Sequence, residues 1–209
     1  MLFKNTVSPE CFELLKAINV SPAFNKFALA GGTSLSLRIG HRISIDLDFF
    51  SESDFDSEKL SEIITEELGN NTILTLEKNT VNLVVNGIKV QFLGHLYPTL
   101  KPYEILEDTK HYSLEDITAM KLNAIANRGD KKDFWDYSYL LERFSPLDTL
   151  AFFQRKYEQR DPWHVIKSLS YFQDANNQPD PVVIKSTSWQ KVKESVLRAQ
   201  KDITSHLKK

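Results

Sequence analysis

The chain has 209 residues, of which 41% are hydrophobic and 26% are charged. These fractions are typical of globular proteins and exclude a disordered chain, a collagen-like repeat and a disulfide-stabilised miniprotein. Lys and Arg total 26 against 28 Asp and Glu, a net charge of -2, which excludes a uniformly basic DNA-coating protein but leaves room for a local basic patch.

The N-terminal part of the sequence begins with a predicted helix. Ser8 is a capping hydroxyl, and Pro9 follows at the first helical position. The residues after it alternate between strand and helix patterns. They predict a strand over 25–30, a helix over 33–39 ended by Gly40, a strand over 43–50 and an amphipathic helix over 56–68.

An antiparallel meander is predicted next, with strands over 72–76, 81–85 and 88–93. The dipeptide Asn86-Gly87 is a strong signal for a two-residue hairpin between the last two. Strands that follow one another directly argue against a doubly wound sheet. They favour an α+β fold with a mixed sheet.

The second half is predicted to be all helical. Ser113 begins a pattern that resembles a capping box, further helices are expected over 131–144 and 189–207, and prolines divide the remainder. We therefore expect two domains, a sheet-containing core over 1–105 and a helical domain over 106–209.

The compartment is indicated only weakly. Cys11 is the single cysteine, so neither an intramolecular disulfide nor a cysteine zinc site is possible. The sequence has no apolar run of the roughly 20 residues that a membrane span needs, and its start lacks the apolar region of a signal peptide. We expect a cytoplasmic protein.

Gly31-Gly32-Thr33-Ser34 lies between a predicted strand and a predicted helix. Paired glycines allow a tight turn and close approach of a ligand, and the N–H groups of a helix start favour anions. The motif therefore suggests a phosphate cradle. Taken alone, a plain turn with a hydroxyl cap explains it better. No lysine follows at P-loop spacing.

Asp46 and Asp48 are two residues apart on the predicted strand over 43–50. Side chains alternate along a strand, so both carboxylates should share one face while Ile45, Leu47 and Phe49 face the core. Such a pair suits Mg²⁺ or Mn²⁺, although a solvated strand face is the alternative. Because the glycine turn comes just before this strand, the combination favours the metal site.

A glycine turn on a short helix followed by Asp-x-Asp on the next strand resembles the polymerase-β-type nucleotidyltransferase fold. The stretch from Gly31 through His41-Arg42 to Ser44-Ile-Asp46-Leu-Asp48-Phe-Phe50 closely resembles the AbiEii/AbiGii-type nucleotidyltransferase toxin family. A second matching motif begins at Asp116-Ile-Thr-Ala-Met-Lys121 and continues through Arg128 and Lys132-Asp133-Phe-Trp-Asp136. The resemblance spans residues 24–141.

This resemblance implies a toxin that transfers a nucleotide from a nucleoside triphosphate with Mg²⁺ or Mn²⁺, partnered by a separately encoded antitoxin. The acceptor it implies is an RNA, such as tRNA, or a protein hydroxyl. The implied roles are triphosphate binding by Gly31, Gly32, Thr33 and Ser34, metal binding by Asp46 and Asp48, phosphate contact by Lys121 and Arg42, and completion of the site by Asp133.

Lys121 can also be interpreted without the resemblance. It lies on a mostly apolar helix, where a lysine more often extends its amine from a packed face into solvent than points into a cleft. The resemblance reverses that preference. A lysine in a cleft would supply the positive charge that phosphoryl transfer needs.

One position departs from the family pattern. Polymerase-like transferases usually carry a third carboxylate on a later strand, and Gln91 stands where we expect it. Glutamine is neutral and cannot act as a base. A catalytically weakened module that binds a nucleotide or RNA therefore remains open. A transferase that modifies a small molecule such as an antibiotic is another alternative, since such enzymes share the fold and the Asp-x-Asp motif.

Overall fold

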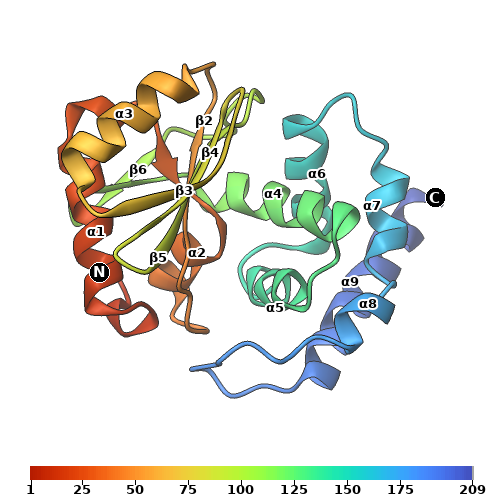
Figure 1. Cartoon of the computed structure of the whole chain (residues 1–209). Helices are drawn as coiled ribbons and strands as arrows, with labels where there is room; N and C mark the ends of the chain where they lie inside the picture. The colour runs from red at the N-terminus through yellow and green to blue at the C-terminus, as the bar shows by residue number, and fades with distance from the viewer. Residues whose placement is uncertain (209) are drawn as a thin grey trace. The chain divides into compact units, whose positions relative to one another are not determined.

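The computed structural model describes residues 1–208 (Figure 1). The chain groups into two compact units, Met1–Ser113 and Leu114 onward. The two-domain division at residues 105 and 106 stays a prediction. By packing, the segment up to Ser113 belongs with the first unit.

The first unit combines a mixed sheet with three α-helices among its described residues. Short 3₁₀ turns at Lys4–Thr6 and Pro22–Phe24 flank the first helix. The elements are α1 (Pro9–Val20), β1 (Ala28–Leu29), α2 (Gly31–Ile39), β2 (Leu47–Ser51), α3 (Ser57–Leu68), β3 (Asn71–Glu77), β4 (Thr80–Val85), β5 (Ile88–Gly94), β6 (Glu104–Leu106) and β7 (Thr109–His111).

The sheet has the strand order β3-β4-β5-β2-β1-β7-β6. The meander β3-β4-β5 is antiparallel throughout, and β5 then pairs in parallel with β2. At the centre β2 pairs antiparallel with β1, which pairs in parallel with β7. This mixed α+β sheet confirms the fold class predicted from the sequence.

The core of the first unit lies on one face of this sheet. Alternate residues of β2, β4 and β5 are fully buried there, and α1 and α3 cover them (Figure 1). Phe92 is at the centre, with its ring stacked on Phe49 and Phe24 at 5.3 Å between centroids. Asp48 and Gln91 lie on the opposite face of these strands and are half-buried.

Three local predictions were wrong. The segment 43–46 is not part of the strand, which begins at Leu47, and Ile45 is 69% exposed rather than in the core. The helix α2 begins at Gly31 rather than at residue 33. The expected strand over 25–30 is reduced to Ala28–Leu29, because Pro22–Phe24 and the turn after it occupy the preceding residues.

The second unit consists of helices in its described part. They are α4 (Leu114–Asn127), α5 (Lys131–Leu140), α6 (Pro146–Lys156), α7 (Pro162–Ser168), α8 (Gln173–Asn176) and α9 (Trp189–Leu207). The helix α4 packs against α5, α6 and α7, and α9 closes the bundle against the same three. An ion pair at 2.7 Å, with both side chains completely buried, joins Lys156 of α6 to Asp116 of α4.

Candidate functional site

The glycine turn begins directly opposite Asp48. The β1–β2 register pairs Leu29 with Phe49, and one residue further on the Ala30 N–H donates to the Asp48 carbonyl at 2.9 Å. Gly31 then has φ +65°, a backbone conformation that residues with a side chain rarely adopt. Strand β1 therefore ends, and α2 begins, beside Asp48, the second carboxylate of the Asp-x-Asp motif.

Both glycines leave room for charged side chains. A Cβ atom on Gly31 would overlap Asp48 Oδ2 and would lie 3.1 Å from Asp48 Cγ. A Cβ atom on Gly32 would overlap Arg42 Nη2 and would lie 3.3 Å from Ser44 Oγ. The start of α2 is thus in close contact with one carboxylate and one guanidinium, and any larger residue would displace them.

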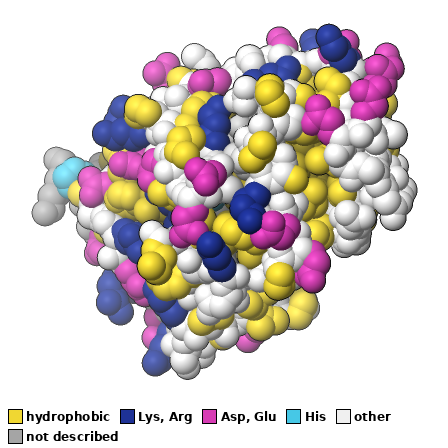
Figure 2. All heavy atoms as spheres, turned by 90° about the vertical axis from the view of Figure 1, so that its left-hand side faces the viewer, with side chains coloured by type: hydrophobic (Ala, Val, Ile, Leu, Met, Phe, Trp, Pro, Cys, Tyr) yellow, Lys and Arg dark blue, Asp and Glu magenta, His cyan; other side chains and the backbone are white. Residues whose placement is uncertain are grey.

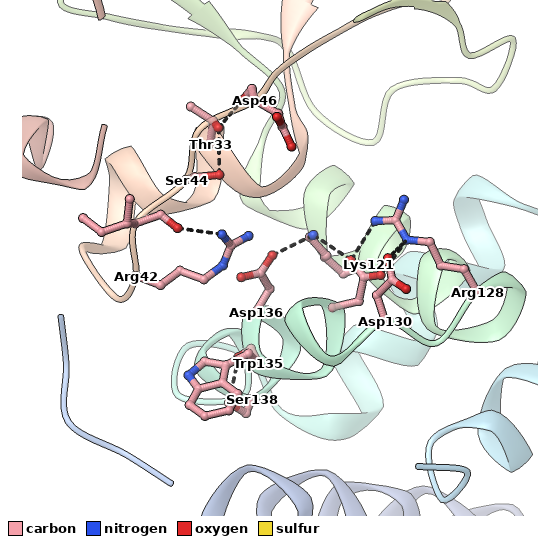
Figure 3. Close-up of polar contacts among 12 residues, drawn as sticks. Thr33, Arg42, Ser44, Asp46, Lys121, Arg128, Asp130, Trp135, Asp136 and Ser138 are labelled. Carbon is pink, nitrogen blue, oxygen red and sulfur yellow. Dashed lines mark hydrogen bonds and ion pairs between the residues drawn. The ribbon is translucent and has the colours of Figure 1, made fainter. Parts of the chain in front are cut away.

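Hydrogen bonds hold the segment between α2 and β2 in place. The Ser44 N–H donates to the Thr6 carbonyl at 2.8 Å, and Arg42 Nη1 donates to the Ile43 carbonyl at 2.9 Å. The Thr33 hydroxyl lies 2.8 Å from Ser44 Oγ and donates to the Asp46 carbonyl (Figure 3). Thr33 is buried, so its hydroxyl positions the backbone of Asp46.

Ser34 is also engaged internally. Its hydroxyl lies 2.8 Å from Nδ1 of His111, whose Nε2 lies 2.7 Å from the Thr109 hydroxyl. Thr109 donates to the Leu106 carbonyl at 2.6 Å, so it accepts from Nε2–H, and Nδ1 accepts from Ser34. Burial, and to a smaller extent the charge of Arg38, lowers the pKa of His111 to about 3. This series of hydrogen bonds between uncharged side chains connects α2 to β7.

Gln91 lies beside Asp48, as the family pattern predicts for a third acidic position. The parallel register of β2 and β5 pairs the two residues directly. On the other side Gln91 pairs with Asn82 of β4, and its amide nitrogen donates to Asn82 Oδ1 at 2.6 Å. Among residues 1–208, no three His, Cys, Asp or Glu side chains cluster in a way that could hold a metal ion.

The donor set nevertheless fits a hard divalent cation. Asp46 and Asp48 carry carboxylate oxygens and Gln91, paired with Asp48 on the neighbouring strand, carries an amide oxygen, and all of these are hard ligands. The absence of a Cβ atom at Gly31 is what lets the Asp48 carboxylate lie against the start of α2. A Mg²⁺ or Mn²⁺ ion bound by these groups would keep several waters, because the protein supplies few of its ligands.

The helical unit contains a second cluster of charged residues. Lys121 of α4 places its ammonium 2.6 Å from Asp136 Oδ2 and 3.0 Å from Asp133 Oδ1 (Figure 3). Both carboxylates project from α5 and are completely buried. Arg128 makes a two-pronged contact with Asp133, from Nε at 2.7 Å and from Nη2 at 3.0 Å.

This cluster holds Lys121 in a fixed position. Burial by itself raises the pKa of Asp133, but Lys121 and Arg128 together outweigh it and hold that pKa below its usual value of 3.8. Asp133 is therefore ionised at neutral pH. The site prediction omitted Asp136 and Arg128, although the spacing of Asp133 and Asp136 by three residues places both on one helix face.

His41, which also matches the family motif, is completely buried in the first unit. None of the described helices is long and apolar enough to cross a membrane. On the face that Figure 2 shows, acidic and basic side chains are interspersed rather than gathered into a field of one sign.

A glycine turn against the second Asp of an Asp-x-Asp motif, on a mixed sheet joined to a helical unit, defines the nucleotidyltransferase class of folds. The profile of the nucleotidyl transferase AbiEii toxin family, a type IV toxin–antitoxin system, matches residues 13–207. The chain belongs to this family, which confirms the resemblance seen in its motifs.

The chain is also similar to one curated protein and to two solved structures. An uncharacterized protein of Aquifex aeolicus is 37% identical over 186 residues, covering 85% of this chain and 88% of that protein. A crystal structure of an H. pylori protein proposed to be a nucleotidyltransferase has a TM-score of 0.57 at 15% identity, covering 96% of this chain and 97% of that one. The crystal structure of JHP933 from Helicobacter pylori has a TM-score of 0.58 at 16% identity, and the match covers 97% of this chain and 95% of that one. At these identities the two structures define the fold alone.

Proposed function

We propose that the protein is a metal-dependent nucleotidyltransferase that uses a nucleoside triphosphate and Mg²⁺ or Mn²⁺. The acceptor would be an RNA, such as tRNA, or a protein hydroxyl. Membership of the AbiEii family supports the class of reaction. The single observation that carries the proposal is the contact of the Gly31 backbone with the Asp48 carboxylate. It supports the proposal because a helix start can bind an anion, and Asp48 is the carboxylate that would hold the cation.

Each residue of the first unit has a role that follows from its contacts. Asp46 and Asp48 would hold the cation, which neutralises charge on the triphosphate oxygens when bound. The N–H groups at the start of α2 would bind phosphate oxygens, and Arg42 would add a guanidinium beside Gly32. Thr33 and Ser34 would act as positioning residues. The Thr33 hydroxyl holds the segment that precedes β2, and the Ser34 hydroxyl binds His111 of β7.

For the helical unit, we propose that Lys121 contacts phosphate oxygens of the donor, as the family resemblance implies. Asp133 and Asp136 would act as positioning residues, since both accept hydrogen bonds or ion pairs from its ammonium. Two carboxylates fix the amine in one place, so that it need not be ordered when the donor binds.

The experiment is a transfer assay with each α-³²P-labelled nucleoside triphosphate, Mg²⁺ or Mn²⁺, total tRNA and cell lysate. Wild type should label an RNA or protein band, whereas Asp46→Asn and Asp48→Asn should not. Asp202→Asn, on the exposed face of α9, is the matched control and should label as wild type does. Equal labelling by Asp48→Asn would refute the metal role.

A toxin paired with an antitoxin is the second part of the proposal, and the family description supports it. Controlled expression of the wild-type gene should arrest growth, and Asp46→Asn should remove the arrest at equal protein level. Growth arrest by both forms would separate toxicity from nucleotide transfer.

Gln91 favours one alternative, a module that binds a nucleotide without transferring it. The observation is the neutral side chain paired with Asp48 where a third carboxylate is expected. This alternative predicts triphosphate binding in equilibrium dialysis with no label transferred by wild type, and a gain of transfer in Gln91→Asp.

A further inference from the structure

The helical unit contains a cavity of about 320 Å³ between the C-terminal end of α5 and the beginning of α9. These two helices pack against each other within the unit (Figure 1), and the segment that precedes α9 completes the wall. The volume is at the lower end of the range for ligand pockets, about 300–1,000 Å³. The described residues that line it include none of those proposed for nucleotide transfer.

One side of the cavity is held by bonds to both helices. The Tyr139 hydroxyl of α5 donates to the Lys185 carbonyl at 2.9 Å, and the Lys185 ammonium lies over the Tyr139 ring, 5.7 Å from its centroid. At the other end of the segment, Ser188 Oγ accepts from the Lys191 N–H at 3.3 Å and caps α9. The backbone that carries the two lysines is therefore tied to the helices that form the cavity.

Most polar side chains in the wall have no partner inside the protein. Within residues 1–208, neither Lys185 nor Lys191 forms an ion pair, and Glu142 forms none either. Three hydroxyls of the same wall make no hydrogen bond in this part of the chain, those of Ser186, Thr187 and Ser195. Two ammonium groups and one carboxylate thus line one small cavity without neutralising each other at ion-pair distance.

This combination of groups is typical of contacts to a nucleic-acid backbone. Phosphate oxygens in such complexes accept hydrogen bonds from lysines, from serine and threonine hydroxyls and from helix N-termini. Lys191 belongs to the first turn of α9, where the helix dipole is positive. The carboxylate of Glu142 accepts hydrogen bonds and donates none. Its partner in a ligand must therefore be a donor, and a sugar hydroxyl is one.

We infer that this cavity binds the ribose-phosphate group of a nucleotide. Lys185, Lys191 and the neighbouring hydroxyls hold the phosphate, and Glu142 accepts from the 2′-hydroxyl of the ribose. The three charged side chains have a net charge of +1, which matches the single negative charge of a phosphodiester. A terminal phosphate carries about -1.5 to -2. The charge match therefore favours a nucleotide within an RNA strand over a free nucleotide as the source of the group.

The test is binding at equilibrium in a buffer with a chelator, so that no divalent cation assists binding at Asp46 and Asp48. The probes are a short fluorescein-labelled oligouridine, a deoxyuridine strand of the same length, and uridine 5′-monophosphate. Fluorescence anisotropy follows the two strands, and calorimetry follows the mononucleotide. Wild type should bind the RNA more tightly than the DNA, because only RNA carries the 2′-hydroxyl.

Variants of the lysines test the contact with phosphate. Lys185→Gln and Lys191→Gln should each weaken RNA binding about tenfold, roughly the contribution of one hydrogen bond to a charged group. Lys201→Gln is the matched control. It removes the same charge from an exposed position of α9 that does not line the cavity, and it should leave the affinity nearly unchanged. Circular dichroism and thermal unfolding verify that each variant folds.

A variant of Glu142 tests the contact with ribose separately. Glu142→Ala removes the acceptor of the 2′-hydroxyl, so the preference for RNA over DNA should disappear. The DNA strand should bind at least as tightly as it does to wild type, because the variant also removes a negative charge from the wall of the cavity. A role of Glu142 in folding alone would change both affinities together and keep their ratio.

The outcomes decide each part of the inference. Equal RNA affinities in Lys185→Gln, Lys191→Gln and Lys201→Gln, or no binding of any probe by wild type, would overturn the cavity as the binding site. A preference for RNA that persists in Glu142→Ala would overturn the contact with ribose. Tighter binding of the mononucleotide than of the RNA, with the same loss in Lys191→Gln, would identify a free nucleotide as the source and overturn the RNA strand. None of these measurements depends on nucleotide transfer.

Discussion

Replacing Gly31 by alanine should impair the site far more than it destabilises the fold. The first contribution to the loss of stability comes from the backbone, because Gly31 has φ +65° and a left-handed conformation costs an L-residue about 1–2 kcal/mol. The alanine also restricts the unfolded chain, which offsets about 0.4–1 kcal/mol. The net loss of roughly 1 kcal/mol should lower Tm by about 2–4 °C in a protein of this size.

The second contribution acts on Asp48. The new Cβ would overlap Asp48 Oδ2 and lie close to Cγ and Cβ as well, so rotation of the carboxylate alone does not relieve the contact. A displacement of about 1 Å at a reacting centre can cost about 10²-fold in rate. Gly31→Ala should therefore reduce nucleotide transfer by about two orders of magnitude and also weaken Mn²⁺ binding.

Gly87→Ala is the matched control in the same unit. Gly87 has φ +83° in the hairpin turn, and a Cβ there would meet nothing within 4 Å. Gly87→Ala therefore has the same unfavourable backbone conformation as Gly31→Ala but makes no contact with Asp48. The variant should lose a similar amount of stability and keep the wild-type transfer rate and metal affinity. Equal transfer rates and equal Mn²⁺ affinities for the two variants would refute the reasoning.

Three further predictions concern other parts of the molecule. Gly32→Ala should displace the end of the Arg42 side chain and press on Ser44 Oγ. Both contacts are with side-chain ends, so transfer should fall while the urea unfolding midpoint stays near that of wild type. Lys121→Met should cost about 3–5 kcal/mol in urea unfolding, because it leaves two buried carboxylates without their shared ammonium. The lowered pKa of His111, about 3 in the folded chain against 6.5, means that the unfolded chain takes up the proton first. Stability should be full above about pH 6.5 and should fall as the pH decreases toward 3, a dependence that a folded His111→Asn variant should show less strongly.

Local patterns were sufficient for the parts of the fold that depend on neighbouring residues. The hairpin at Asn86 and Gly87 forms as predicted, with φ +49° and +83°, because this dipeptide tolerates both positive angles. Gly40 ends α2 in the left-handed conformation, as a helix C-cap requires. The helix predicted over 189–207 also matches α9 at both ends.

The errors lie where distant residues decide the structure. The alternation around Asp46 indicates a strand, but the backbone groups of Ser44 and Asp46 bond to Thr6 and Thr33 instead of a strand. The strands β6 and β7 were missed because they are three residues long, and because β7, the partner of β6, joins the sheet through β1, far away in sequence. No local signal specifies such partners.

The candidate site was predictable in its outline and not in its details. The chain order of turn and Asp-x-Asp motif was enough to expect Gly31 near Asp48, and the parallel register of β5 with β2 places Gln91 beside Asp48. The internal use of the Thr33 and Ser34 hydroxyls could not be predicted, because their partners come from other segments. The catalytic roles of all these residues stay predictions.

The pairing of β1 with β7 has a consequence for how the protein is made. Leu29 pairs with His111, which the ribosome adds about 80 residues later, a delay of roughly 4–16 s at usual rates of synthesis. Until then one side of β1 has no neighbouring strand, and α2 lacks the bond from Ser34 to His111. The part of the site carried by the first unit is therefore fixed late in translation, well after Asp48 has been added to the nascent chain.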